Sequence, residues 1–311
     1  MARVVVLGAA GFLGSHLCDY LVARGDTVVG IDDLSSGNLK NIEHLSNQDQ
    51  FSFFQNDICL DIPVQGTIDA VLNFASPASP PRYLERPIHT LRTGSQGTER
   101  ALEMAVAANA RFIMASTSEV YGDPSEHPQS ESYNGNVNPI GYRSCYDEAK
   151  RYSEALCMAY ARSRDANIGI VRIFNTYGPR LDATDGRVVS NFITQALAGD
   201  DITIYGQGLQ TRSFCYVSDL VRGVVSLLDS SEQGPINIGN PTENTMLELA
   251  STVIELCKSS SKLVFCDLPM DDPMRRKPDI TKAMNQLNWQ PQIALEDGLR
   301  TTIDWFSEST N

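Results

Sequence analysis

The segment "RVVVLGAAGFLGSHLCDYLVARG", from Arg3 to Gly25, constrains the fold more than any other part of the chain. It opens with a run of valines and Leu7, which is typical of a strand buried on both faces. The glycines of "GAAGFLG" follow, and apolar residues then recur at helical spacing until Gly25. A buried strand that leads through a glycine-rich turn into a helix predicts a parallel sheet covered by helices.

The same alternation continues through the first half of the chain. Patterns typical of buried strands recur at "TVVGIDD", "FSFF", "DAVLNFA", "RFIMAST" and "IGIVRIFN", with helical segments between them, among them one across about residues 88–108. At least six such repeats predict an α/β fold with a doubly wound parallel sheet of the Rossmann type. Later, the short strands "ITIY", "PINIG" and "KLVF" mix with helices. We therefore expect a first domain over residues 1–175 and a smaller mixed α/β lobe over residues 176–311, with a soft, interleaved boundary.

Composition excludes several classes of protein. The 311 residues carry a net charge of −13, which argues against nucleic-acid or anionic-membrane partners. Seven cysteines without CxxC spacing predict reduced thiols, and four histidines without ligand spacing predict no metal site. No apolar run approaches the length of a membrane span, and the early first strand argues against a signal peptide. We expect a cytoplasmic protein.

The glycine turn predicts a dinucleotide site. Gly8, Gly11 and Gly14 allow backbone to approach a pyrophosphate, and the helix start offers it free N–H groups; the alternative is that they only form a turn. A carboxylate ending the second strand accepts both ribose hydroxyls and repels a 2′-phosphate, which favours NAD over NADP. Asp32 is nearer the strand than Asp33, and both remain candidates. The residues expected to contact NAD are Gly8, Gly11, Phe12, Leu13, Gly14, Asp32, Asp33, Asp57, Ile58, Phe74, Ala75, Thr93, Tyr146 and Lys150.

Two later segments bring chemical groups to the same edge of the sheet. "ASTSEVYG" ends the fifth strand, and ligands of open parallel sheets bind at such strand ends. "SCYDEAK" places Tyr146 and Lys150 four apart on one helix face, where the alternative is a packed ring and a solvated amine. A tyrosine base near neutrality needs its pKa lowered from ~10 by roughly 3 units, which a nearby ammonium supplies in part. We predict a proton-handling pair, with Thr117 or Ser118 hydrogen-bonded to the same substrate oxygen.

GxxGxxG, a Ser/Thr-rich strand end and YxxxK together resemble the short-chain dehydrogenase/reductase superfamily, and the length resembles its extended, sugar-nucleotide branch. Nearly the whole chain is similar to the UDP-glucuronate decarboxylases, also called UDP-xylose synthases, in the collinear motifs "NFASPASPPRY", "STSEVYGDP", "SCYDEAKR", "RIFNTYGPR", "DGRVVSNFI", "QTRSFCYVSDL" and "RRKPDI". "SPASPP" and "RKPDI" are the most specific, since sister enzymes usually lack both. At the position of Gly94, near the active centre, the family usually has asparagine. The local hydrogen-bond relay of the family is therefore left unassigned in this chain.

The resemblance implies an enzyme that converts UDP-glucuronate to UDP-xylose with NAD as a bound catalyst. The sugar C4 hydroxyl is oxidised, CO2 leaves from the resulting β-keto acid, and bound NADH reduces C4 again. Tyr146 is implied to handle the C4 proton and Lys150 to hold the nicotinamide ribose. Glu119 and Arg276 are implied to act on the carboxylate and C5 side. Since arginine stays protonated in proteins, we favour a role for Arg276 in placing a water or closing the site.

The anionic UDP group requires cations in an otherwise acidic chain. Arg212 is the first candidate for binding the pyrophosphate, and Arg187 and Arg275 are the next candidates. Arginine suits this role because one guanidinium group can donate to two phosphate oxygens. The residues expected around the nucleotide, each with ordinary packing as the alternative, are Asn175, Val189, Asn191 and Tyr205. Those expected around the sugar are Pro77, Ser79, Arg82 and Tyr83. Residues 1–175 are thus predicted to bind NAD, and residues 176–311 the nucleotide sugar.

Other functions compete with this one. A UDP-sugar 4-epimerase usually lacks the glutamate at Glu119, and a 4,6-dehydratase usually has an Asp–Glu pair where this chain has Ser118 and Glu119. A decarboxylase that stops at UDP-4-keto-pentose is a further alternative. A non-catalytic NAD-sensing scaffold has no need of Tyr146 and Lys150. Apolar residues on the helices near 88–108 and 146–164 predict a homodimer through a helix bundle, as in the superfamily.

Overall fold

The computed structural model describes residues 1–267 and 275–309. Its centre is a seven-stranded parallel sheet in the order β11-β6-β5-β4-β1-β2-β3. The strands are β1 (Arg3–Leu7), β2 (Thr27–Asp32), β3 (Phe51–Gln55), β4 (Ala70–Asn73), β5 (Arg111–Thr117), β6 (Ile168–Ile173) and β11 (Ile236–Ile238). Along the chain, β2 and β3 are added on one side of β1, and β4, β5 and β6 are then added on the other side. This confirms the predicted doubly wound sheet, and the reversal between β1 and β4 is where such sheets bind ligands.

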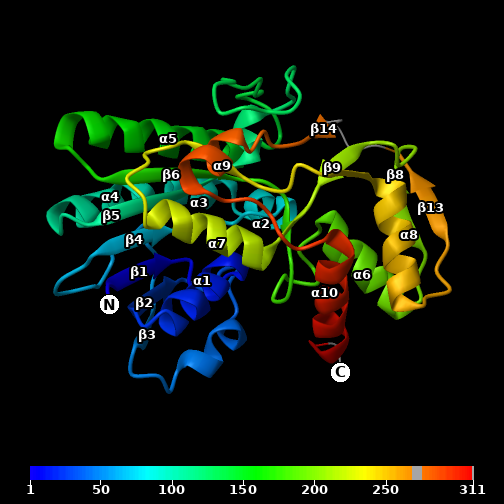
Figure 1. Ribbon diagram of the computed structural model, residues 1–311, viewed down its shortest axis with the longest axis horizontal. Coiled ribbons are helices and arrows are strands. Elements are labelled where there is room, and N and C mark those ends of the chain that lie inside the picture. Colours follow the sequence, from blue (N-terminus) through cyan, green and yellow to red (C-terminus); the bar gives the residue numbers. More distant parts are fainter. Residues whose placement is uncertain (268–274, 310–311) are drawn as a thin grey trace.

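Helices cover both faces of the sheet (Figure 1). Neighbouring residues of β1 point to opposite faces, so Val4 and Val6 belong to one apolar core and Val5 and Leu7 to the other. The first core is closed by α1 (Phe12–Ala23), α7 (Val217–Leu228) and α9 (Thr281–Leu287). The second core is closed by α4 (Thr98–Ala107) and α5 (Ser144–Arg164). The sheet is therefore buried on both faces, as its valine-rich strands predict.

The helix expected across residues 88–108 contains a break in its hydrogen-bond pattern. It consists of α3 (Pro87–Arg92), a π-helical turn η3 (Thr93–Gly97) and α4. Glycines let this turn pack closely, since a Cβ at Gly97 would lie 2.7 Å from Ile58. Turns of this kind are frequent at functional sites.

Two of the connections differ from the expected alternation of strands with helices. Only the short 3-10 turns η1 (Leu39–Asn41) and η2 (Glu43–Leu45) join β2 to β3, and the loop from β3 to β4 contains no helix. Turn-forming residues such as Gly37 and Asn38 dominate the first connection, and the Asn38 side chain accepts a hydrogen bond from the Lys40 backbone. The prediction of helices between all strands was wrong here.

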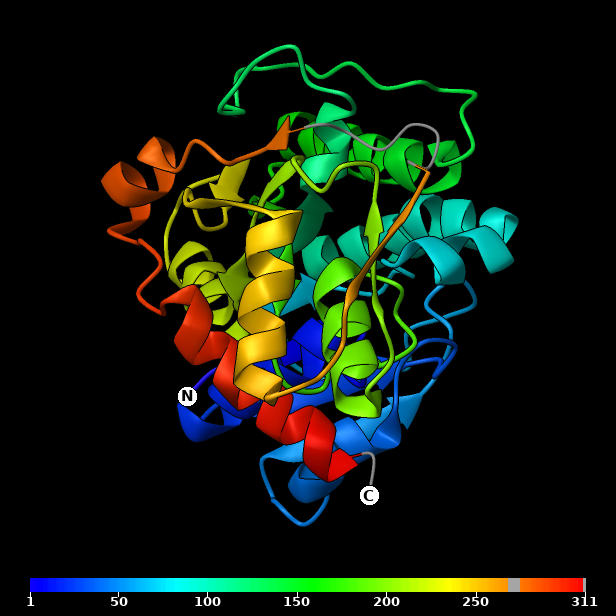
Figure 2. The ribbon, with the colours of Figure 1, turned by 90° about the vertical axis from the view of Figure 1, so that its right-hand side faces the viewer.

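The smaller lobe packs three helices around a core of its own, seen face-on in Figure 2. They are α6 (Val188–Ala198), α8 (Met246–Cys257) and α10 (Leu295–Ser309). Two small sheets join them, one of β8 (Ile202–Tyr205) with β13 (Leu263–Cys266), the other of β12 (Glu243–Thr245), β9 (Thr211–Ser213) and β14 (Arg275–Arg276). The remaining elements are α2 (Pro80–Glu85), η4 (Ser118–Tyr121), β7 (Thr176–Tyr177) and β10 (Cys215–Tyr216).

The strand predicted at "PINIG" does not belong to the smaller lobe. It is β11, which pairs with β6 at the edge of the main sheet. The chain therefore returns to the first core after it has begun the second. Among the described residues, no helix combines the length and apolarity needed to cross a lipid bilayer.

Candidate active site

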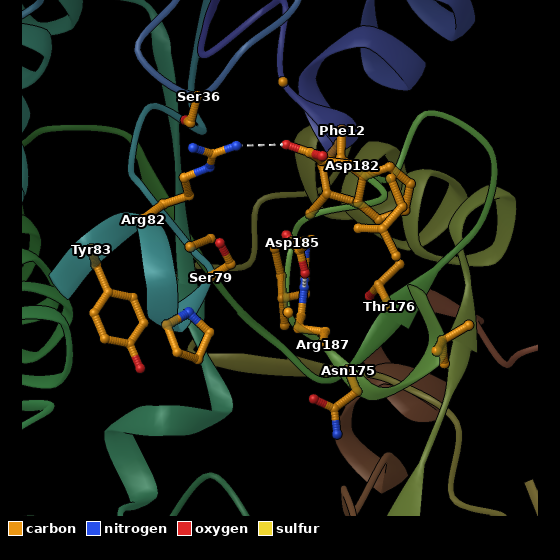
Figure 3. A pocket seen from close by; sticks show the side chains of 18 of the residues that line it. Phe12, Ser36, Ser79, Arg82, Tyr83, Asn175, Thr176, Asp182, Asp185 and Arg187 are labelled. Carbon is orange, nitrogen blue, oxygen red and sulfur yellow. Dashed lines mark hydrogen bonds and ion pairs between the residues drawn. The ribbon is translucent and has the colours of Figure 1, made fainter. Parts of the chain in front are cut away.

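One cavity of about 1600 Å³ opens where the carboxyl ends of the sheet strands meet the smaller lobe. Figure 3 shows part of its wall, with Phe12 and Ser36 from the first domain facing Asn175, Thr176 and Arg187. A second, smaller cavity adjoins it and shares Gly8, Gly11 and Phe74. The two together form one groove across the switch point of the sheet.

Nearly all residues predicted from the sequence lie in this groove. Those lining the larger cavity are Gly8, Gly11, Phe12, Leu13, Gly14, Phe74, Ser79, Arg82, Tyr83, Thr117, Ser118, Glu119, Tyr146, Lys150, Asn175, Arg187, Val189, Asn191, Tyr205, Arg212 and Arg276. Those lining the smaller one include Asp32, Asp33, Asp57, Ile58, Ala75, Pro77 and Thr93. Arg275 is exposed on β14 and lines neither cavity, so the structure does not bring it to the others.

The glycine turn brings β1 and α1 into close contact. Gly8 has a φ of 83°, and a Cβ there would lie 2.7 Å from the Phe74 carbonyl carbon. A Cβ on Gly14 would lie 1.9 Å from the Gly8 carbonyl oxygen. No side chain caps the start of α1 after Gly11, and the glycine turn itself lines the cavity. The first N–H groups of α1 are thus available to an anion.

The two aspartates at the end of β2 have different surroundings. Asp32 is buried and accepts hydrogen bonds from the backbone N–H groups of Ala10 (3.0 Å) and Leu34 (2.8 Å). Burial raises the pKa of Asp32 to about 6, although these donors oppose the shift. Asp33 is partly exposed and accepts instead from the backbone and hydroxyl of Ser35. Asp32 is therefore the carboxylate tied to the glycine turn.

In and beside the smaller cavity lie His89 and Cys59, which the sequence did not single out. The His89 imidazole lies between Asp33 (3.6 Å from Nε2) and Asp57 (3.9 Å from Nδ1). The Cys59 thiol is 3.7 Å from the Thr93 hydroxyl. Among the described residues, Asp57, Cys59 and His89 place potential ligand atoms within 4.8 Å of one another. No spacing rule connects His89 with the other two, and the absence of a metal site stays a prediction.

Tyr146 and Lys150 lie buried on the face of α5 that packs against β5. The Lys150 ammonium donates to the Ala115 carbonyl (2.9 Å) and lies 5.8 Å from the centroid of the Tyr146 ring. Burial raises the pKa of Tyr146 to about 12, although a hydrogen bond with Thr117 and the charge of Arg187 lower it. Burial also lowers the pKa of Lys150 to about 8. The protein alone therefore does not lower the pKa of Tyr146 as expected, because the effect of desolvation outweighs that of the neighbouring cations.

A second tyrosine lies flat on the first. The rings of Tyr83 and Tyr146 stack with centroids 5.0 Å apart and planes 8° from parallel. Tyr83 is 1% exposed, and its hydroxyl has no hydrogen-bond partner within residues 1–267 and 275–309. The stacked ring fixes the plane of Tyr146 and brings a second phenol to the cavity wall.

The Glu119 carboxylate lies between two arginines on the other side of the site. Its Oε2 accepts from Arg143 at 2.6 Å, and its Oε1 pairs closely with Arg276, which is 3% exposed. Burial alone would raise the pKa of Glu119, but Arg276, Arg143 and Arg212 lower it below its usual range. The sequence named Glu119 and Arg276 and missed Arg143, because no spacing rule joins these segments. The result is a half-buried carboxylate held ionised by guanidinium groups.

Asp147 follows Tyr146 and is buried behind the same cluster. Burial and the Glu119 charge raise its pKa to about 7, while Arg143 and Arg276 lower it. One of its oxygens, Oδ1, has no hydrogen-bond partner among the residues that the structure describes. Asp147 therefore lies next to the Glu119 cluster without lining either cavity.

Two aspartates of the smaller lobe form ion pairs at the cavity wall. Arg187 pairs with Asp185 through Nε and one terminal nitrogen, and Arg82 of α2, from the first domain, donates to Asp182 at 3.0 Å (Figure 3). Both aspartates line the cavity, and no sequence pattern indicated either. Arg212 lines the cavity and donates to the Thr211 carbonyl at 2.9 Å. Cationic side chains are thus concentrated in the groove of an acidic protein.

Gly94, where the family usually has asparagine, lies in the π-helical turn against α5. A Cβ at Gly94 would lie 2.6 Å from the Ala149 Cβ. The Gly94 carbonyl accepts a hydrogen bond from the Ser153 hydroxyl at 2.7 Å. Ala149 therefore fills the space that a larger side chain at Gly94 requires.

Comparison with known proteins places this groove in a family. Residues 4–239 match the NAD dependent epimerase/dehydratase family. The chain is 50% identical to UDP-glucuronic acid decarboxylase 1 of Arabidopsis thaliana over 98% of its own length and 69% of that protein. It is 48% identical to UDP-glucuronic acid decarboxylase 1 of Danio rerio over 98% of its length and 72% of that protein.

A solved structure agrees with these matches. UDP-glucuronic acid 4-epimerase from Bacillus cereus, in complex with UDP-glucuronic acid and NAD, superposes with a TM-score of 0.87 at 31% identity, covering 99% of both chains. The present chain belongs to the NAD dependent epimerase/dehydratase family and, within it, to the UDP-glucuronic acid decarboxylases.

Proposed function

We propose that this protein is an NAD-dependent enzyme that decarboxylates UDP-glucuronate to UDP-xylose. The observation that carries the proposal is the half-buried Glu119 carboxylate, which pairs with Arg143 and with the buried Arg276 close to Tyr146. A neutral hexose has no group that matches several guanidiniums, whereas the C6 carboxylate of glucuronate does. The identity of about 50% with decarboxylases over nearly the whole chain supports the same assignment.

The groove fits NAD at the end formed by the first domain. The pyrophosphate is held at the start of α1, where Gly8 and Gly14 have no room for a side chain. The Asp32 carboxylate accepts the hydroxyls of the adenosine ribose, and the smaller cavity receives the adenine. Lys150 holds the nicotinamide ribose. When bound, NAD supplies the oxidant that is regenerated in the last step and a positive charge beside Tyr146.

Tyr146 moves the proton of the sugar C4 hydroxyl. With a pKa of about 12 in the ligand-free protein, its phenol needs further stabilisation as phenolate to act near neutral pH. Thr117 and Ser118, at the end of β5, hydrogen-bond to the same sugar oxygen. After the C4 proton has been taken up, the Tyr146 phenol donates to the ketone oxygen and stabilises the enolate that forms as CO2 leaves.

The Glu119 cluster receives the sugar carboxylate and the C5 side. Loss of CO2 from a β-keto acid needs a polarised ketone and a poorly solvated carboxylate, but no strong base. Arg276 is deeply buried and cannot give up its proton, so it orients the carboxylate or a water. A water held by the ionised Glu119 carboxylate and by Arg276 gives its proton to C5, and solvent replaces that proton, since the reaction consumes one proton for each CO2 released. Tyr146 finally returns its proton to the C4 oxygen.

The UDP group occupies the wall from the smaller lobe. Arg212 and Arg187 bind the pyrophosphate, and Arg187 exchanges part of its pairing with Asp185 for phosphate oxygens. The nucleotide is surrounded by Asn175, Val189, Asn191 and Tyr205, and the sugar by Pro77, Ser79, Arg82 and Tyr83. Residues 1–175 thus bind mainly NAD, and residues 176–311 mainly the nucleotide sugar.

Assembly and location complete the proposal. Exposed apolar side chains on α3 and α5, namely Ile88, Leu91 and Tyr152, support a homodimer in which these helices form a four-helix bundle. All seven cysteines are unpaired thiols, which supports a reducing compartment such as the cytoplasm. Light scattering of wild type and of Ile88→Glu tests the homodimer. Fluorescence microscopy of a tagged chain in its own cell tests the cytoplasmic location.

A product assay tests the reaction. Purified protein is incubated with UDP-glucuronate and NAD, and the products are identified by mass spectrometry and proton NMR. UDP-xylose and CO2 are expected. UDP-galacturonate with its carboxylate intact would make the chain an epimerase instead, and UDP-4-keto-pentose would mean that the final reduction is missing.

A further inference from the structure

The face of α5 that carries Tyr146 and Lys150 continues with a third polar residue. Glu154 follows Lys150 by four positions, so the three share one helix face. Each contacts one of three consecutive residues at the end of β5. Tyr146 is hydrogen-bonded to Thr117, Lys150 donates to the Ala115 carbonyl at 2.9 Å, and Glu154 accepts from the Ser116 hydroxyl at 2.6 Å.

Glu154 is held by an arginine from the next strand. Arg172 of β6 donates to Glu154 through Nε (2.9 Å) and through a terminal nitrogen (2.7 Å). Arg172 is also the register partner of Ser116 across the β5–β6 pair. The side chains of Arg172 and Glu154 are only 11% and 14% exposed. A planar two-point contact of this kind fixes direction as well as distance.

The same guanidinium reaches the other side of the site. Its remaining terminal nitrogen donates to the Tyr121 hydroxyl at 3.0 Å, and the Arg172 Cζ lies 4.8 Å from the Tyr121 ring centroid. Tyr121 ends η4, the turn that carries Ser118 and Glu119. The Tyr121 hydroxyl in turn donates to Asn237 of β11 at 2.7 Å. One ion pair therefore contacts both the helix of Tyr146 and the turn of Glu119.

We propose that the Glu154–Arg172 ion pair has a positioning role: it holds α5 in place, so that Tyr146 and Lys150 lie correctly relative to Thr117 and Glu119. Neither Glu154 nor Arg172 lines either cavity, so both act through other residues. Replacing a buried ion pair by apolar side chains is often neutral or stabilising, so stability alone does not account for this pair. Only the kinetic test of this inference depends on the proposed function.

The test uses the double variant Glu154→Met/Arg172→Met, which removes both charges together. A single Arg172→Met would leave Glu154 buried and unpaired and could unfold the chain. We expect a melting temperature within a few degrees of wild type and a kcat for UDP-glucuronate about 10²-fold lower, with KM within about threefold. Displacement of Thr117 from Tyr146 removes a contact that lowers the tyrosine pKa, so the rising limb of the pH–kcat profile moves to higher pH.

A matched control lies at the opposite end of the sheet. Arg24 pairs with the buried Asp26 at 2.6 Å, before the start of β2. Arg24→Met/Asp26→Met removes an ion pair of similar kind and is expected to keep kcat and the pH profile of wild type. Glu154→Gln, which retains hydrogen-bonding capacity, is expected to lose only about tenfold in kcat.

Two results would overturn the proposal. One is that kcat and the pH profile are unchanged in the Glu154→Met/Arg172→Met variant. The other is that this variant loses kcat, but the Arg24→Met/Asp26→Met control loses as much, or the melting temperature of the variant falls along with its kcat. If wild type releases no CO2, the proposed function fails by itself. A crystal structure of the Met/Met variant then still decides on positioning, since we expect the contacts of Lys150 with Ala115 and of Tyr146 with Thr117 to be broken.

Discussion

The two ends of the groove hold their carboxylates in opposite ways. At the cofactor end, Asp32 is surrounded by neutral backbone donors, and burial raises its pKa to about 6. At the sugar end, Glu119 is half-buried, and guanidinium groups lower its pKa below the usual range even though burial opposes this shift. Peptide dipoles therefore suit a site that binds hydroxyl groups and phosphates. Full positive charges suit a site that must also accept a second carboxylate.

The two ends also differ in how the chain builds them. The cofactor end comes from nearby segments, since Ala10 and Asp32 are 22 positions apart. The sugar end joins Glu119 not only to Arg143, 24 positions away, but also to Arg276, which is 157 positions away. Tyr146 lies between the two ends and serves both. Changes at each end are therefore expected to affect different properties.

The largest effect is expected at the shared centre. Tyr146→Phe removes the only atom of that side chain that can carry the C4 proton, so kcat is expected to fall about 10³-fold or more. NAD affinity, measured by fluorescence titration, is expected to change less than about threefold. Near-normal turnover would show that another group handles this proton.

A change at the sugar end is expected to act on the substrate and not on NAD. Arg276→Gln leaves Glu119 with one close arginine fewer, and kcat/KM for UDP-glucuronate is expected to fall about 10²-fold, with the NAD dissociation constant unchanged. The neighbouring Lys277, which lies 3.5 Å from Glu243, offers a control. Lys277→Gln is expected to stay within about threefold of wild type, and equal losses in both variants would contradict the role given to Arg276.

Asp147 offers a prediction for stability. Its folded pKa of about 7 lies above the 3.8 that is usual for an aspartate, so the folded protein holds a proton that the unfolded chain releases. The protein therefore loses stability as pH rises from about 4 through 7, and this cost is fully present above pH 7. Asp147→Asn removes that cost and is expected to raise the free energy of unfolding by about 2 kcal/mol at pH 8, and by little at pH 4. Urea unfolding at both values checks it; an equal gain at both would contradict the assignment.

The smallest effect is expected at the cofactor end. Asp32→Asn keeps the shape but weakens acceptance of two ribose hydroxyls, and the NAD dissociation constant is expected to rise about tenfold. Asp33→Asn is the matched control and is expected to change it less than about threefold, since Asp33 contacts Ser35 and not the glycine turn. The reverse order would assign the ribose to Asp33. Binding of UDP alone is expected to be unaffected by either variant.

The same contrast explains how much the sequence could predict. The doubly wound sheet, the glycine turn and Asp32 follow local rules of strand periodicity and turn geometry, and the fold prediction was confirmed. The end of the fifth strand brought Glu119 to the site, but its role, and Arg276 altogether, came from family resemblance. Arg143, Asp182 and Asp185 were missed because no local pattern of strand, turn or helix spacing marks them. The raised pKa of Tyr146 could not be predicted from spacing, since it depends on burial by residues such as Tyr83.

The most direct test of the proposed reaction follows two atoms of the substrate. UDP-glucuronate labelled with carbon-13 at C6 and deuterium at C4 is incubated with the NAD-loaded protein, and the products are analysed by mass spectrometry and NMR. The account predicts that all released CO2 carries carbon-13 and that UDP-xylose keeps deuterium at C4, because the same cofactor removes and returns it. Carbon-13 that remains in a hexuronate nucleotide, with no labelled CO2, would contradict it.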